Sequence, residues 1–98
     1  MYINIIRSYR DIVAVCDVEL LGKVFEEEKF QLDVKESFYK GEKVNEPKAI
    51  KLMKDMVLED ATFNIVGKKS IDAAIKAGVI HKNSVGEIQG VPFALILL

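Results

Sequence analysis

Residues for metal binding and redox chemistry are scarce in this chain of 98 residues. It holds one cysteine, Cys16, and one histidine, His81, which excludes an internal disulfide and a structural zinc site of the usual cysteine and histidine type. Tryptophan is absent as well. The core must therefore be built mainly from isoleucine, leucine, valine, methionine and phenylalanine.

The chain also lacks an excess of charge of one sign and a long apolar segment. It has 14 Lys and Arg residues against 15 Asp and Glu, so it has no global basic field of the kind that drives non-specific nucleic-acid binding. No stretch approaches the roughly 20 apolar residues of a membrane helix. The first residues read as a strand rather than as a signal peptide. We therefore expect a cytoplasmic protein with no membrane partner.

What is present fits one globular domain. The chain is 50% hydrophobic and 30% charged, whereas a disordered chain carries fewer large apolar residues. A length of 98 residues leaves room for a single domain over residues 1–98.

Apolar runs in the N-terminal half predict four strands. Residues 2–6 and 12–16 are joined by a short polar link, which predicts a hairpin. The unbroken apolar run at 12–16 indicates a strand that is covered on both faces. Residues 23–26 and 30–34 alternate between apolar and polar side chains, which predicts a second pair of strands.

Three residues of the connections carry local predictions. Asp17 is expected to cap a short turn that ends at Gly22. Gly41, within an irregular segment, is expected to supply a positive φ.

The strongest predicted element is a helix over residues 47–58. Asn45 suits the N-cap and Pro47 the first turn. At 100° per residue, six apolar side chains fall within an arc of about 160° and predict a helix that lies on a sheet. These residues are Ala49, Ile50, Leu52, Met53, Met56 and Val57.

The C-terminal half predicts a strand, a second helix and a closing hairpin. The strand covers residues 62–66, and Gly67 leads into a helix over 68–77 that stops at Gly78. Residues 85–88 and 93–98 are the strands of the hairpin. The predicted fold is therefore α+β, with a mixed or mostly antiparallel sheet and two helices.

The first candidate site is the segment Gly67, Lys68, Lys69 and Ser70 between a strand and a helix. Free N–H groups at a helix N-terminus bind anions, and lysines there are unfavourable to the helix itself. One interpretation is therefore that these lysines serve a phosphate or nucleic-acid ligand. The alternative is that they are only solvated. A phosphate-binding P-loop is excluded, because Thr62 occupies the position of its first glycine.

The second candidate is the row Lys48, Lys51 and Lys54 on the polar side of the first helix, with the aromatic residues Phe38 and Tyr39 expected nearby. Such a row tracks a nucleic-acid backbone or forms a solvated helix face. A nucleophilic pair of Cys16 and His81 is disfavoured, since Cys16 ends an apolar run. No catalytic residue, metal ligand or cofactor is predicted.

The apolar run at residues 93–98 has two interpretations. As an exposed edge strand it would pair with another chain, which predicts a homodimer or a docked protein. As a central strand it would be covered by the rest of the domain.

Five stretches along the chain, at residues 13–23, 37–41, 64–67, 74–80 and 90–94, resemble in their order the mainly archaeal domain of unknown function 424 family. The resemblance implies a compact, stand-alone α+β domain that is cytoplasmic and archaeal. Where the family pattern often has a histidine after its Gly-Val-Pro turn, this chain has Phe93, and Leu95 replaces a polar residue two places later. That departure argues against acid–base chemistry at the turn.

Three functions remain open, with a non-catalytic binding module favoured over an enzyme. The first is a module that engages RNA or a ribonucleoprotein through its lysines. The second is a protein-interaction or structural subunit that uses the C-terminal strand. The third is a small-molecule enzyme with an anion site at residues 67–70.

Overall fold

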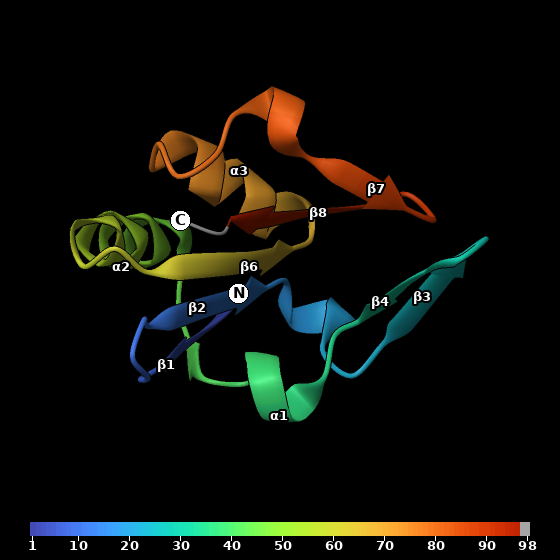
Figure 1. Cartoon of the computed structure of the whole chain (residues 1–98), viewed down its shortest axis with the longest axis horizontal. Coiled ribbons are helices and arrows are strands. Elements are labelled where there is room, and N and C mark those ends of the chain that lie inside the picture. The colour runs from blue at the N-terminus through green and yellow to red at the C-terminus, as the bar shows by residue number, and fades with distance from the viewer. Residues whose placement is uncertain (97–98) are drawn as a thin grey trace.

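A mixed sheet of six strands forms the centre of the protein, in the order β5-β1-β2-β6-β8-β7. Figure 1 shows this computed structural model, which describes residues 1–96. The strands β3 and β4 form a separate hairpin. The elements are β1 (Tyr2–Ile6), β2 (Ile12–Cys16), η1 (Val18–Leu20), β3 (Val24–Glu27), β4 (Phe30–Asp33), α1 (Glu36–Tyr39), β5 (Glu42–Lys43), α2 (Glu46–Leu58), β6 (Thr62–Val66), α3 (Lys68–Lys76), η2 (Lys82–Ser84), β7 (Gly86–Ile88) and β8 (Val91–Ile96).

One pair of strands in the sheet, β2 with β6, is parallel, and the other described pairs are antiparallel. The parallel register runs from Ile12 opposite Thr62 to Cys16 opposite Val66. The carboxyl ends of these two central strands therefore meet at one edge of the sheet. The α+β class with a mixed sheet and two main helices is confirmed.

The helices α2 and α3 cover one face of the sheet and build the larger core. Met53 of α2 and Ala74 of α3 are fully buried there against Phe63 and Ile65 of β6. Asn45 caps α2 as expected, because its Oδ1 accepts the backbone N–H of Lys48 at 3.1 Å. One of the six apolar side chains departs from the prediction, since Val57 in the last turn of α2 is exposed.

A smaller core lies on the other face, under α1 and the β3–β4 hairpin. Ala14, Cys16 and Val66 of the sheet are buried there with Val34 and Tyr39. In Figure 1 the hairpin projects from the body beside the β7–β8 end of the sheet. The strand β2 is thus covered on both faces, as its unbroken apolar sequence predicts.

The prediction for Gly41 is wrong. The glycines with positive φ are Gly22, Gly67, Gly78 and Gly90. Gly41 instead lies against β1, where an added Cβ would clash with the carbonyl oxygen of Ile3. Close approach of the chain to β1, rather than backbone handedness, requires a glycine at this position, directly before β5.

The C-terminal strand is internal to the sheet only at its start. β8 lies between β6 and β7 in the strand order, and β7 pairs with Val91 to Phe93. Phe93 to Ile96 pair with β6, and Ala94 to Ile96 have no partner in β7. The central interpretation is therefore correct for the start of the strand, and pairing of the following residues with another chain stays a prediction. Residues 97 and 98 of the predicted strand lie outside the described residues.

None of the helices in residues 1–96 is both long enough and apolar enough to span a membrane.

Candidate ligand-binding site

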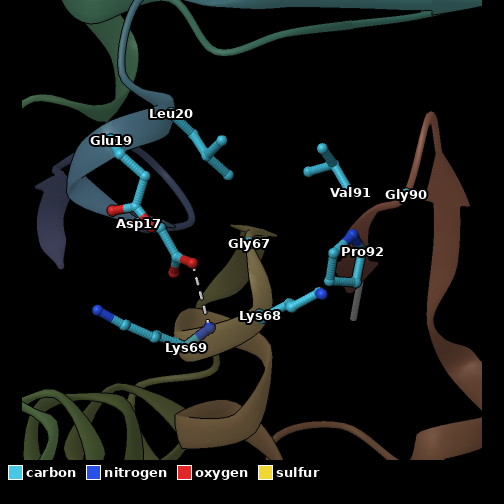
Figure 2. Close-up of a pocket in the computed structure, with 9 residues that line it drawn as sticks. All are labelled: Asp17, Glu19, Leu20, Gly67, Lys68, Lys69, Gly90, Val91 and Pro92. Atoms are coloured by element: carbon cyan, nitrogen blue, oxygen red, sulfur yellow. Dashed lines mark hydrogen bonds between the residues drawn. The ribbon is translucent and has the colours of Figure 1, made fainter.

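The carboxylate of Asp17 lies at the N-terminus of α3 and is almost completely buried. Its Oδ2 accepts the backbone N–H of Lys69 at 3.2 Å, and its Oδ1 accepts both the N–H and the hydroxyl of Ser70 at 2.8 Å. Figure 2 shows this carboxylate directly above the first turn of the helix. A negative charge at this end of a helix is favourable, because the first N–H groups have no partner within the helix.

Backbone hydrogen bonds join three strand ends at the same place. The N–H of Asp17 donates to the carbonyl of Val66 at 3.1 Å, and the N–H of Gly67 donates to the carbonyl of Pro92 at 2.8 Å. Gly67 has a φ of 106°, and a Cβ there would clash with the carboxyl group of Asp17. The glycine therefore permits both the backbone turn and the close approach of the carboxylate.

The expectation that Asp17 caps the turn after its own strand is wrong. It precedes η1 but makes no side-chain hydrogen bond to it. Its carboxylate caps α3 instead, which follows more than fifty positions later in the sequence. The predicted site therefore missed its central residue, and the only signal for it was a polar side chain directly after a buried strand. The N–H groups of Lys69 and Ser70 are consequently occupied by Asp17 rather than open to a ligand.

A pocket of about 240 Å³ lies beside this junction (Figure 2). Leu20 and Val91 face each other across it, and Pro92 forms part of its wall. Such a volume is below that of drug-sized ligand sites, so it suits a small group such as a single base or side chain. The lining residues are Asp17, Glu19, Leu20, Gly67, Lys68, Lys69, Gly90, Val91 and Pro92.

Lys68 and Lys69 line this pocket and are exposed. Figure 2 shows the side chain of Lys68 extending toward Pro92 and that of Lys69 extending the other way, beneath Asp17. No ion pair joins either lysine to a carboxylate within residues 1–96. Their ammonium groups are therefore available to an anionic ligand.

The lysine row on α2 lies elsewhere and is partly neutralised. Lys48 pairs with Glu42, and Lys51 pairs with Asp55 at 3.1 Å. Lys54 has no ion pair within the part of the chain that the structure describes.

An ion pair between Lys76 and Glu46, at 2.9 Å, places the start of α2 at the far end of α3 from Lys68. The structure therefore does not unite the two predicted lysine groups in one site.

The aromatic residues that were expected beside the α2 lysines also lie elsewhere. Phe38 and Tyr39 belong to the core on the opposite face of the sheet from α2, where their rings pack edge to face at 5.0 Å. The prediction of an aromatic surface beside the α2 lysines is wrong.

Cys16 is buried in the smaller core, and burial is the main cause that raises the pKa of its thiol to about 11. His81 is exposed and follows Ile80, which packs in the larger core on the other face. The two residues therefore do not form a nucleophile and base. Within residues 1–96, no group of three or more His, Cys, Asp or Glu side chains is arranged to hold a metal ion.

Comparison with known proteins gives a family and a fold relative. A family model described as "Protein of unknown function (DUF424)" matches residues 6–98. The chain is similar to the crystal structure of an uncharacterized conserved protein from Methanopyrus kandleri, with a TM-score of 0.87 and 26% identity over 97% of this chain and 88% of that one. No curated protein matches the chain.

Proposed function

This chain belongs to the DUF424 family, a family of unknown function, and we propose that it is a non-catalytic binding module for RNA, free or within a ribonucleoprotein. The proposed contact is made by Lys68 and Lys69 at the rim of the pocket.

The observation that carries the proposal is the pair of adjacent lysines without carboxylate partners in residues 1–96, beside an apolar wall. Ammonium groups attract the phosphates of a nucleic acid. The apolar side chains of Leu20 and Val91 offer contact to a base or sugar. Asp17 reduces the local repulsion between the helix N-terminus and these lysines without occupying their ammonium groups.

Binding is favoured over catalysis by the chemistry of the pocket. Its one buried ionisable side chain, Asp17, already accepts three hydrogen bonds from α3. The thiol of Cys16, with a pKa of about 11, stays protonated at neutral pH and is a poor nucleophile. A group that serves as general base must be free to accept a proton from substrate.

The lysines of α2 form a second, weaker part of the proposal. Exposed ion pairs such as Lys51 with Asp55 contribute little energy, so an RNA phosphate competes for these lysines easily. Because they lie apart from the pocket, their contribution is separable by mutation.

The test is retention of bulk cellular RNA on filters across a series of salt concentrations. Each lysine that contacts a phosphate adds about 0.7 to the slope of log affinity against log salt for a single strand. We expect Lys68→Gln combined with Lys69→Gln to lower that slope by about 1.4.

The matched control is Lys35→Gln combined with Lys82→Gln, which removes the same charge from exposed positions outside the pocket. An equal decrease of the salt slope in both double variants would show that the effect comes from net charge alone and not from the pocket. Absence of salt-sensitive retention of the wild type at low ionic strength would refute RNA binding. A variant with Lys48, Lys51 and Lys54 all changed to Gln measures the contribution of the α2 lysines to RNA binding.

We further propose that the protein is archaeal and cytoplasmic, as the family resemblance and the single buried cysteine suggest. Fractionation of the native cell tests this setting, and affinity purification with and without nuclease tests the association with RNA. Partners that disappear with nuclease support RNA-dependent association. Partners that persist point to a protein contact instead.

A further inference from the structure

The turn between β1 and β2 displays an aromatic side chain between the two arginines of the chain. Tyr9 is fully exposed, and Arg7 and Arg10 flank it in the sequence. Figure 1 shows this turn at the end of the β1–β2 hairpin. A single exposed aromatic residue is common on protein surfaces, so its surroundings decide what it means.

Hydrogen bonds hold the backbone of the turn in place. Asp11 accepts from the guanidinium of Arg7 at 2.7 Å and from the N–H of Ser8 at 3.3 Å, and its carbonyl accepts the N–H of Thr62 at 2.9 Å. The hydroxyl of Ser8 donates to the carbonyl of Arg10. The turn is therefore tied to itself and to the start of β6.

Two side chains are left out of this network. Within residues 1–96, neither the phenol of Tyr9 nor the guanidinium of Arg10 makes a hydrogen bond or an ion pair. Arg7 neutralises Asp11, so the charge that remains at the tip is that of Arg10. A hydrogen-bonded turn thus presents one aromatic ring and one planar cation at adjacent positions of the chain.

We infer that this turn is a contact site for single-stranded nucleic acid, with the ring of Tyr9 stacked on one base and Arg10 bound to an adjacent phosphate. Proteins that bind single strands combine these two elements, a ring that accepts any base face and a cation for the backbone.

The site is separate from the pocket. β2 begins beside the turn at Ile12 and ends beside Asp17, and a strand of five residues is about 16 Å long. One nucleotide therefore cannot reach both places, while a strand of several nucleotides can. The inference shares the ligand class of the proposed function but not its residues.

The experiment measures binding of labelled RNA and DNA oligonucleotides by fluorescence anisotropy. We expect Tyr9→Ala to weaken binding about fivefold or more, the loss expected for one base–aromatic stack. Tyr9→Phe should bind like the wild type, since the ring is retained. An oligonucleotide with abasic positions should show no difference between wild type and Tyr9→Ala.

The matched control is Phe30→Ala, which removes another aromatic side chain that is 69% exposed, on the β3–β4 hairpin. If Tyr9→Ala binds like the wild type, or if Phe30→Ala loses as much, the inference is overturned. Loss in the Lys68 and Lys69 double variant together with no effect at Tyr9 would overturn this inference alone. Failure of the wild type to bind any oligonucleotide at low salt would overturn both proposals.

Discussion

At the scale of single residues, Asp17 fixes the junction between two strands and a helix. A carboxylate that accepts three hydrogen bonds in a buried position stabilises the fold only while all its partners stay in place. Its location could not be predicted from neighbouring residues, because the helix that it caps is brought there by the parallel pairing of β2 and β6. The sequence identified the pocket lysines as candidates, but it did not predict that Asp17 caps the helix on which they lie.

Gly67→Ala is expected to destabilise the protein by about 2–3 kcal/mol. The backbone at Gly67, with φ 106° and ψ 154°, lies in a region that is essentially restricted to glycine. The new Cβ would also displace the carboxyl group of Asp17 from α3. The free energy of unfolding in urea measures the loss.

Gly22→Ala is the control for backbone strain alone. Gly22 also has a positive φ, of 83°, but an added Cβ meets no atom within 4 Å. We expect a loss of about 1 kcal/mol there. Equal losses at the two glycines would show that the contact between Gly67 and Asp17 contributes nothing.

At the scale of elements, α2 was predictable and β8 was only partly so. Asn45 and the apolar spacing of α2 are local signals, and the helix begins one residue before the predicted start. The place of β8 between β6 and β7 depends on which strands pair, and an apolar run reads the same at an edge as in the centre. The prediction that Val57 is buried is wrong because helix periodicity does not show where the sheet beneath the last turn of α2 ends.

Met53→Asp is expected to unfold the domain. Met53 has no exposed surface and packs in the larger core, so an aspartate there would bury a charge without a partner. That cost is comparable to the roughly 5–15 kcal/mol that stabilises a typical domain. Far-ultraviolet circular dichroism and the urea midpoint report the result.

Lys54→Asp on the same helix is the matched change at an exposed position and should stay folded. A folded Met53→Asp protein with an unchanged midpoint would contradict the central role of α2. Met53→Ala should cost about 2–5 kcal/mol, which keeps the effect measurable if the charged variant is not recovered.

At the scale of the whole molecule, the sheet separates two unequal cores, and the smaller one holds two groups that resist ionisation. Burial is the main cause that raises the pKa of Cys16 from 9.0 to about 11 and that of Tyr39 from 10.0 to about 12. Both groups favour the neutral form in the folded protein. Their contribution to stability is therefore complete below the unfolded pKa values and is lost as the pH rises through the folded ones.

We expect the free energy of unfolding to fall as the pH rises from about 9 to about 12, with Cys16 acting first. Urea unfolding at several pH values measures this. Cys16→Ala should lose less stability than the wild type between pH 9 and about 11, because the buried thiol is gone. The two proteins differ only at residue 16, so the difference between their pH profiles isolates the thiol. Identical pH dependence in the two proteins would rule out this role of Cys16.

The parallel pairing of β2 with β6 also has a consequence for the order in which the chain acquires its structure. The hairpins β1–β2, β3–β4 and β7–β8 join segments close in sequence, whereas Ile12 meets Thr62 only after the whole intervening chain has closed into a loop. Such distant contacts slow folding. During synthesis, β2 must therefore wait on the nascent chain with an unpaired apolar edge until β6 has left the ribosome, and that interval is when the protein is most exposed to aggregation.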